Sequence, residues 1–176
     1  MVQLHDKTFE PYISESEIGE IVKRMASQME SLESQNPLFI VILKGSFFFA
    51  ADLLKALSFD SELTFMQVKS YEGTQSSGQI KDILGVPINC KDRTIVIIED
   101  IVDTGNTLEY LINRLNQENP KKIYTASLLL KPSVYSKKIP IDFVGKEIPN
   151  DFVVGYGLDY DELGRTLTQI YKLKNS

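Results

Sequence analysis

Residues able to act as an imidazole base or as soft metal ligands are scarce in this 176-residue chain. It contains one cysteine, Cys90, and one histidine, His5. A single cysteine cannot form an intrachain disulfide, and no Cys/His cluster has the spacing of zinc ligands. Ser-His-Asp or Cys-His catalysis would depend on His5 alone, which we expect to lie in a loose N-terminus. The sequence therefore argues against a disulfide scaffold, a zinc site and a triad hydrolase, and it favours a reducing cytoplasm.

An excess of basic charge and long apolar runs are absent as well. The chain has 19 Lys and Arg against 24 Asp and Glu, which gives a net charge of −5 and an isoelectric point near 5.0. Nucleic-acid and membrane-surface proteins usually present a basic face. No apolar run approaches membrane-spanning length, and the N-terminus MVQLHDKTFE lacks the basic-then-apolar pattern of a signal peptide. We therefore expect small-molecule partners, with no nucleic acid and no membrane, and a cytoplasmic location.

Strand and helix patterns alternate along the chain. Ser14 and Glu17 form a capping-box pattern at the start of an apolar stripe with helical spacing. The patterns predict strands at 38–43, 62–69, 94–98, 122–130, near 143 and from 152 onward, and helices at 47–57 and from 105. The polar stretch between Ser70 and Lys81 predicts a mobile loop. With 43% hydrophobic residues, we expect a single α/β domain over residues 1–176, built on a mainly parallel, doubly wound sheet flanked by helices.

The segment 94–108, TIVIIEDIVDTGNTL, joins a buried strand to two kinds of polar group. Its first five residues, 94–98, are all β-branched, as suits a strand buried on both faces of a parallel sheet. Glu99 and Asp100 follow, and bare carboxylates there would be costly unless cations or hydroxyls met them. After Asp103 comes a short polar turn at a helix start, where unpaired backbone N–H groups and the helix dipole favour an anion. Carboxylates for a sugar or metal therefore stand beside donors for a phosphate.

Alone, an acidic pair and a D-T-G-x-T turn are equally well explained as a strand end and a helix cap. The complete segment, however, closely resembles the phosphoribosyl pyrophosphate signature of the type I phosphoribosyltransferases. Three further segments resemble the 6-oxopurine branch of that family, the hypoxanthine and hypoxanthine-guanine phosphoribosyltransferases: LKGS at 43–46, KSY at 69–71 and FVVGYGLDYDELGR at 152–165. All occur in the family's order and at its spacing, and the resemblance runs from about Leu38 to the C-terminus.

The resemblance implies a fold, an activity and a cofactor. The fold would be that of the type I phosphoribosyltransferases, with a small hood formed by terminal segments. The activity would be purine salvage, in which the 5-phosphoribosyl group of 5-phosphoribosyl 1-pyrophosphate is transferred to hypoxanthine, and to guanine, with release of pyrophosphate. The cofactor would be Mg²⁺. The resemblance also favours a homodimer or homotetramer, and the run Phe47-Phe48-Phe49 would contribute to an interface or, equally well, form a buried helix face.

The resemblance assigns roles around the phosphoribosyl donor. The sugar 5′-phosphate would be held by the backbone N–H groups and hydroxyls of the polar turn: Asp103, Thr104, Gly105, Asn106 and Thr107. Glu99 and Asp100 would face the ribose hydroxyls and support the Mg²⁺, and Asp159 would be a second metal-site carboxylate acting through water. Pyrophosphate would be contacted by three residues: Lys44, Gly45 and Arg165. In the family the Lys-Gly peptide of this turn is often cis, but the sequence does not reveal whether the Lys44–Gly45 bond is.

Other residues resemble those that bind the purine. Asp103 matches the general base that accepts a proton from the imidazole ring of the purine, a role that needs no histidine. Lys131 matches the lysine that donates to the exocyclic oxygen at position 6, which selects oxopurines over adenine. Phe152 would stack on the base, while Val153 and Asp159 would contribute to binding its edge. Read alone, a strand-end lysine and a core aromatic residue explain Lys131 and Phe152 equally well.

Ser70 and Tyr71 would close over the site together with the loop that follows them and exclude water. Two positions depart from the better-known animal enzymes. Asn106 stands where those enzymes have lysine, which leaves the backbone donors of the turn in place. Gly157 replaces alanine and bears on the shape of the base pocket.

Two other functions share part of this pattern. A regulatory protein of the same fold would sense phosphoribosyl pyrophosphate while binding DNA or RNA, but such regulators usually carry a DNA-binding domain or a basic face, and this sequence suggests neither. An adenine or other base transferase is opposed by Lys131 and by the segment 152–159. The choice among hypoxanthine, guanine and xanthine rests largely on backbone contacts, which side-chain identity does not encode.

Overall fold

The computed structural model describes residues 1–70, 80–84 and 89–174, with the backbone alone for 69–70 and 80–84. Its centre is a six-stranded sheet in the order β5-β4-β3-β6-β7-β8. Five neighbouring strands run parallel: β4 (Glu62–Ser70), β3 (Leu38–Leu43), β6 (Thr94–Val102), β7 (Lys122–Leu130) and β8 (Phe143–Glu147). The edge strand β5 (Ile80–Leu84) pairs antiparallel with β4. The predicted, mainly parallel sheet is confirmed.

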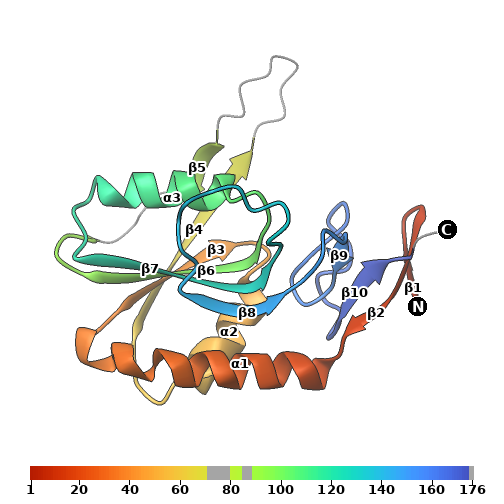
Figure 1. The fold of residues 1–176 in the computed structure, drawn as a ribbon, viewed down its shortest axis with the longest axis horizontal. Coiled ribbons are helices and arrows are strands. Elements are labelled where there is room, and N and C mark those ends of the chain that lie inside the picture. The colour runs from red at the N-terminus through yellow and green to blue at the C-terminus, as the bar shows by residue number, and fades with distance from the viewer. Residues whose placement is uncertain (71–79, 85–88, 175–176) are drawn as a thin grey trace.

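Helices cover both faces of this sheet (Figure 1). α1 (Glu15–Met29) and α2 (Phe47–Ala56) lie on one face, and α3 (Asn106–Asn116) lies on the other. α1 begins where the capping box predicts, because the Ser14 hydroxyl accepts a hydrogen bond from the Glu17 N–H at 3.2 Å. A 3₁₀ helix (Glu30–Gln35) follows α1 directly. Within the described ranges, every helix is too short or too polar to cross a membrane.

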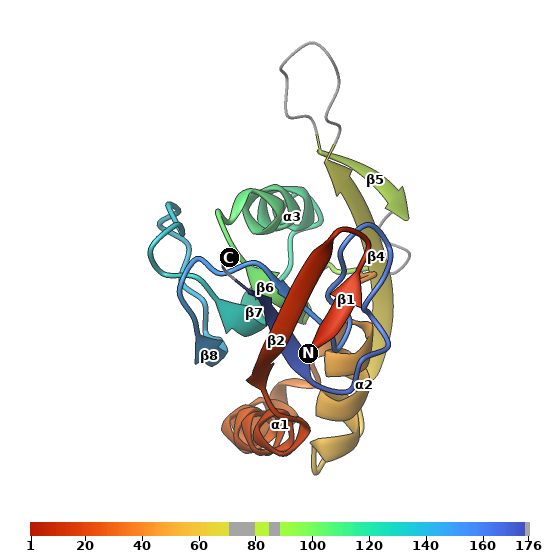
Figure 2. The ribbon, with the colours of Figure 1, turned by 90° about the vertical axis from the view of Figure 1, so that its right-hand side faces the viewer.

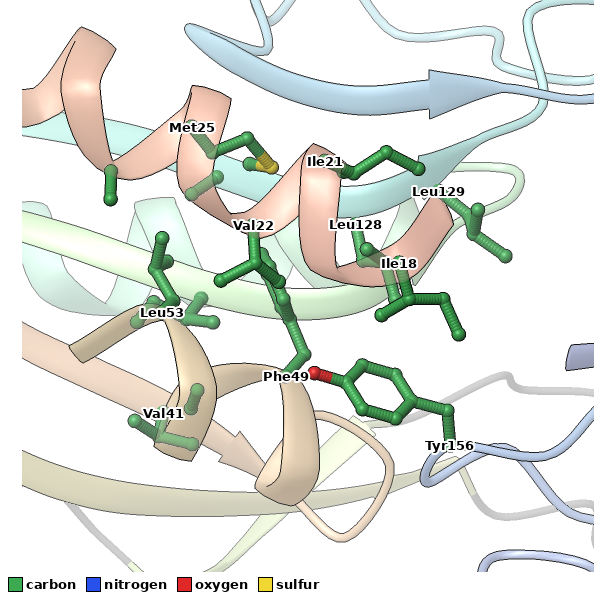
Figure 3. Packing of buried hydrophobic residues seen from close by; sticks show 14 of the residues in the cluster. Ile18, Ile21, Val22, Met25, Val41, Phe49, Leu53, Leu128, Leu129 and Tyr156 are labelled. Atoms are coloured by element: carbon green, nitrogen blue, oxygen red, sulfur yellow. The ribbon is translucent and has the colours of Figure 1, made fainter. Parts of the chain in front are cut away.

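Side-chain alternation along the strands builds one core on each face of the sheet. In β3, Phe39 and Val41 pack with α1 and α2, whereas Ile40 packs in the core that contains α3. Each such buried side chain contributes about 1.5–3 kcal/mol relative to an exposed one, so the register of the strands is strongly specified. Figure 3 shows the core between α1, α2 and the sheet, which includes Ile18, Val22, Met25, Phe49 and Leu53.

The terminal segments form a second, antiparallel sheet in the order β1-β2-β10-β9. Its strands are β1 (Val2–Leu4), β2 (Lys7–Ile13), β9 (Val153–Val154) and β10 (Ile170–Leu173). Figure 1 shows this sheet beyond the end toward which β8 points, and Figure 2 views it from that side. It is the predicted hood. The loose N-terminus expected around His5 is wrong, because β2 pairs with β10 and the Nε2 of His5 lies 3.2 Å from the Asp161 carbonyl oxygen.

Two predicted boundaries also differ from the structure. The signature strand was expected to end at Ile98, but β6 continues to Val102 because its last residues still pair with β7. The loop predicted over 70–81 is shorter, since β4 includes Ser70 and β5 begins at Ile80. The rest of that predicted loop, 71–79, lies outside the described residues.

Candidate active site

Three strand ends bring most of the predicted site residues to one edge of the central sheet. Because β3, β6 and β7 are parallel neighbours, the residues that follow them meet at the same edge. The Lys44–Gly45 turn follows β3, the 103–107 turn follows β6, and Lys131 follows β7. The chain between β9 and β10 reaches this edge from the hood, where Gly157 lies against the Gly45 backbone.

The 103–107 turn is shaped for an anion. Gly105, the N-cap of α3, has a φ of +83°, and a Cβ there would lie 2.5 Å from the Tyr135 ring and 2.8 Å from Cγ of Lys137. Both backbone conformation and space therefore require glycine. The turn forms the wall of a pocket of about 80 Å³ together with Glu99 and the flanking residues of 101–108. The first N–H groups of a helix have no intrahelical acceptor, so this pocket offers donors and a favourable dipole to a phosphate.

The acidic pair on β6 is largely withdrawn from water, with Glu99 buried and Asp100 half-buried. Glu99 is 7% exposed, and its burial, together with the charge of Asp100, raises its pKa well above the usual value. Burial raises the pKa of Asp100 to about 6, although backbone hydrogen bonds and the charge of Arg165 act in the opposite direction. The charge of Asp159 adds to the rise. Carboxyl groups that oppose one another's ionisation are stabilised by a cation or by sugar hydroxyls placed between them.

The acidic groups fit a weakly held magnesium ion better than a closed metal site. Among the described residues, no three acidic, His or Cys side chains are grouped so that they could hold a metal by themselves. Mg²⁺ commonly uses only one or two protein carboxylates and takes its other oxygens from water and substrate phosphates. Asp100 and Asp159 are close enough for the charge of one to shift the pKa of the other, and they meet this smaller requirement.

The turn after β3 is packed tightly on two sides. A Cβ on Gly45 would overlap the Asp100 carboxylate, with the Cγ of Asp100 only 2.5 Å away. On the other side, Gly157 has a φ of +103°, and a Cβ there would overlap the Gly45 carbonyl oxygen. Glycine at both positions therefore lets the turn after β3 lie against Asp100 on one side and against the chain at Gly157 on the other. The cis peptide is the Leu43–Lys44 bond. The sequence left open whether the Lys44–Gly45 bond is cis, and the structure has the cis bond one position earlier.

Lys131 and Asp103 form an ion pair across the ends of β7 and β6. The Nζ of Lys131 donates to Oδ2 of Asp103 at 3.0 Å. The Lys131 side chain is 8% exposed and that of Asp103 is 48% exposed, so the ammonium is nearly buried and the carboxylate faces the solvent. Strand pairing brings the two together, because Val102 pairs with Leu130 and the Lys131 N–H donates to the Val102 carbonyl at 3.0 Å.

Lys44 and Arg165 share an acceptor, Glu162, that the sequence analysis did not single out. The Nζ of Lys44 lies 3.0 Å from one carboxylate oxygen of Glu162, and the Nη2 of Arg165 lies 3.3 Å from the other. Arg165 also forms an ion pair with Asp159 at 2.8 Å and donates to the Gly157 carbonyl at 2.8 Å. The three-residue spacing of Asp159, Glu162 and Arg165 was the signal in the sequence that could have identified this network.

Phe152 and Val153 connect the site to the hood. Val153 is 6% exposed in β9, whereas Phe152 is 42% exposed. The Phe152 ring is supported by Phe9 and Tyr160, with ring centroids 6.0 and 5.7 Å away. The Nζ of Lys7 lies 5.5 Å from the same ring centroid, a contact that the sequence analysis also missed. A supported but exposed aromatic ring is suited to stacking on a flat ligand.

Comparison with known proteins agrees with this architecture. Residues 14–161 match the family model described as the phosphoribosyl transferase domain. The chain belongs to the phosphoribosyl transferase family. It is 44% identical over 164 residues to the hypoxanthine-guanine phosphoribosyltransferase of Bacillus subtilis, with 92% of this chain and 91% of the relative covered. A crystal structure of a hypoxanthine phosphoribosyltransferase from Staphylococcus aureus aligns with a TM-score of 0.89 at 36% identity, over 97% of this chain and 94% of that one.

Another relative of this phosphoribosyl transferase is much longer. The bifunctional protein TilS/HprT of Listeria monocytogenes is 39% identical over 173 residues, which are 97% of this chain and 27% of the relative. The chain therefore spans about a quarter of the length of that relative.

The family resemblance and the predicted fold class are confirmed, whereas the roles of individual residues stay predictions. The structure groups the donor-side residues and the Lys131–Asp103 pair at one edge. For the predicted lid, the Ser70 side chain and all of Tyr71 lie outside the described residues. A larger cavity, of about 540 Å³, lies between α1, α2 and residues 166–168. Its lining residues are separate from those of the 103–107 turn and of the three strand ends.

Proposed function

We propose that this phosphoribosyl transferase acts in purine salvage. It would transfer the 5-phosphoribosyl group of 5-phosphoribosyl 1-pyrophosphate to hypoxanthine, and to guanine, and form the nucleoside 5′-monophosphate and pyrophosphate. The names of its relatives in Bacillus subtilis and Staphylococcus aureus support this assignment. The observation that carries it is the Lys131–Asp103 pair at 3.0 Å beside the anion-binding turn. An ammonium donor and a carboxylate acceptor at this spacing match the oxygen at position 6 and the neighbouring imidazole N–H of a 6-oxopurine.

The donor would bind with its two ends at different turns. The sugar 5′-phosphate would accept hydrogen bonds from the backbone of 103–107 and from the hydroxyls of Thr104 and Thr107. The pyrophosphate of the donor would meet Lys44 and the Gly45 backbone, which follow β3, and Arg165, which reaches them from the chain between β9 and β10. The ribose would then lie across β6, next to Glu99 and Asp100.

Bond making and bond breaking follow from this arrangement. One imidazole nitrogen of the base attacks the glycosidic carbon while Asp103 accepts the proton from the other nitrogen. The bond from that carbon to pyrophosphate breaks, and its electron pair leaves with the pyrophosphate. The carbon gains positive charge, which the carboxylates of Glu99 and Asp100 stabilise. Lys131 donates to the oxygen at position 6, so adenine, which carries an amino group there, is disfavoured.

The remaining assignments complete the site. Asp100 and Asp159 would hold Mg²⁺ through oxygen and water, and this ion supplies positive charge that makes pyrophosphate a better leaving group. Phe152 would stack on the base, and Val153 would offer backbone groups to its edge. Ser70 and Tyr71 would close over the donor and exclude water.

We also propose a cytoplasmic location, a homodimer or homotetramer, and a single domain over 1–176. The location is supported by the lone cysteine. The assembly is supported by Phe47 and Phe48, which are 50% and 37% exposed on α2, while Phe49 is fully buried in the core. The run of three phenylalanines therefore both fills the core and leaves an apolar surface.

Steady-state turnover of hypoxanthine, guanine, xanthine and adenine with phosphoribosyl pyrophosphate tests the proposal. We expect formation of 6-oxopurine nucleotides only when Mg²⁺ is present, and a kcat/KM for adenine that is lower by about 5- to 150-fold, since an unpaired buried donor costs about 1–3 kcal/mol. Competitive turnover of adenine would contradict the role of Lys131. No turnover of any base despite measurable donor binding would instead indicate a regulatory protein of the same fold.

A further inference from the structure

Glu162 lies between the two cationic side chains that the proposed function assigns to pyrophosphate. Its carboxylate accepts from the Nζ of Lys44 through both oxygens, at 3.0 and 3.1 Å, and from the Nη2 of Arg165 at 3.3 Å. Lys44 and Arg165 come from sequence positions more than a hundred residues apart, and one acidic side chain connects them. A carboxylate that bridges two cations presents them with the same oxygen acceptors as a phosphate group does.

The backbone aims Glu162 at this position. Asp161 and Glu162 both have positive φ values, +47° and +68°, in the turn closed by reciprocal hydrogen bonds between Tyr160 and Leu163. The Glu162 N–H donates to Oδ2 of Asp159 at 2.8 Å, which fixes the turn against a second site residue. Positive φ is uncommon for residues other than glycine, so the surrounding contacts hold an unusual conformation here.

The bridge contributes little to the stability of the fold. The side chains of Lys44 and Glu162 are 53% and 66% exposed, and ion pairs this exposed have small net free energies. Arg165 is less exposed, at 23%, and its Nε is buried without an acceptor among the described residues. The hydrogen bond from Lys44, followed by that from Arg165, holds the pKa of Glu162 below its usual value, so the carboxylate is charged at neutral pH. Lys44 is therefore paired with an anion that can easily leave, and Arg165 is shared between that anion and Asp159.

We propose that Glu162 is an internal anion that occupies the pyrophosphate cations of the ligand-free enzyme and must leave them before pyrophosphate or the donor diphosphate binds. This inference rests on the proposed function, because it takes Lys44 and Arg165 as pyrophosphate contacts. When a ligand binds only after a competing contact opens, its apparent affinity is the intrinsic affinity multiplied by the fraction of molecules in which that contact is open. The displaced carboxylate stays near the diphosphate and repels it, which favours release of the product pyrophosphate.

The substitution Glu162→Gln removes the charge and keeps the size of the side chain. Titration calorimetry of the whole chain with inorganic pyrophosphate, in the presence of Mg²⁺, should give a Kd about three- to tenfold lower than that of the unaltered protein, since one exposed pair is worth less than about a tenfold change. The Michaelis constant for phosphoribosyl pyrophosphate should fall in the same direction. Inosine 5′-monophosphate, which would use the 103–107 turn and the base site, should bind within about twofold of the unaltered protein.

Glu62→Gln is the matched control. Glu62 is 56% exposed and pairs with Arg93 at 3.0 Å, but it lies at the start of β4, away from the strand ends that carry the site. Its substitution should leave both Kd values unchanged. Glu162→Ala serves as a second variant and should tighten pyrophosphate binding in the same direction, and a thermal melt of each variant checks that the fold is kept.

Two results would overturn the inference. Pyrophosphate binding that is unchanged or weaker in both Glu162 variants would show that this carboxylate does not compete. Equal tightening of pyrophosphate and inosine 5′-monophosphate would indicate a general charge effect rather than occupation of one site. If the unaltered protein turns over 6-oxopurines and binds pyrophosphate, but the variants give either of these results, only this inference falls. If the unaltered protein neither turns over 6-oxopurines nor binds pyrophosphate, the proposed function falls as well.

Discussion

The ion pair between Lys131 and Asp103 should be strongly asymmetric in its effect on stability. The Lys131 side chain is 8% exposed and the Asp103 side chain 48% exposed, and their charged atoms are 3.0 Å apart. Replacing Asp103 by Ala leaves a nearly buried ammonium without its carboxylate. Replacing Lys131 by Met removes the buried charge, fills a similar volume, and leaves a carboxylate that water can reach. We therefore expect Asp103→Ala to destabilise the fold more than Lys131→Met.

The separation of the charges sets the size of the effect. At 3.0 Å the Coulomb attraction is about 5.5 kcal/mol at an effective dielectric constant of about 20, and about 1.4 kcal/mol in bulk water. Because Asp103 is half exposed, the lower part of this range applies, and water entering the vacated space hydrates the ammonium in part. We expect a loss of about 1–3 kcal/mol in the free energy of unfolding for Asp103→Ala. For Lys131→Met we expect a loss below about 1 kcal/mol, or a small gain.

Urea unfolding at neutral pH, followed by far-UV circular dichroism, measures both free energies of unfolding. In a thermal melt, a difference of about 2 kcal/mol between the variants should appear as about 4–8 °C in Tm, since 1 kcal/mol shifts Tm by about 2–4 °C in a protein of this size. Glu118→Ala is the control, because Glu118 pairs with Arg114 at 2.7 Å while both side chains are partly exposed, at 39% and 31%, so that neither charge is as buried as that of Lys131. Its loss should be within about 0.5 kcal/mol.

Equal losses for the two variants, or a larger loss for Lys131→Met, would refute this reasoning. Either result would mean that burial of the ammonium does not determine the free energy of the pair. A loss for Asp103→Ala no larger than that for Glu118→Ala would lead to the same conclusion.

Three further predictions address catalysis and the fold. Asp103→Asn should lower kcat by about 10²–10⁴-fold with little change in the Kd of the donor, measured by steady-state kinetics and calorimetry; unchanged turnover would remove Asp103 from its role as base. Gly45→Ala should lower kcat/KM for phosphoribosyl pyrophosphate, because its Cβ would displace the Asp100 carboxylate; kinetics equal to those of the unaltered protein would show that the turn can yield without loss. Ser14→Ala removes the acceptor for the Glu17 N–H and should cost about 1 kcal/mol, or about 2–4 °C in Tm, and an unchanged melt would exclude a contribution from this cap.

Much of the fold and the membership of the site could be predicted because the relevant signals are local. The β-branched run of 94–98 predicted a strand buried on both faces, and the small polar residues after Asp103 predicted a helix start. Both are confirmed, with Gly105 as the N-cap of α3. The helix start at Ser14 is confirmed as well, since its hydroxyl accepts from the Glu17 N–H, whereas the Glu17 carboxylate accepts from Lys146. The mainly parallel sheet that the alternation of strands and helices predicted also brings the turns after neighbouring strands to one edge.

Errors arose where the outcome depends on pairing with distant segments. The N-terminal residues carry little local signal, and they are ordered because β2 pairs with β10 more than 150 residues later. The strand of the signature continues through Glu99 and Asp100 because β7 pairs with it, which the change from apolar to acidic residues conceals. The position of the cis peptide, at Leu43–Lys44, is likewise absent from local residue preferences.

The sequence by itself determined which elements form and which residue types follow the ends of β3, β6 and β7. Hydrophobic periodicity and turn chemistry act over only a few residues. Only the tertiary structure decided which charges meet at those strand ends. Lys131 faces Asp103 because β6 and β7 are neighbours, and Glu162 bridges Lys44 and Arg165 because a turn from the hood meets the end of β3. Electrostatic free energy depends on distance and solvent exposure, and both are set only when segments far apart in the chain pack together.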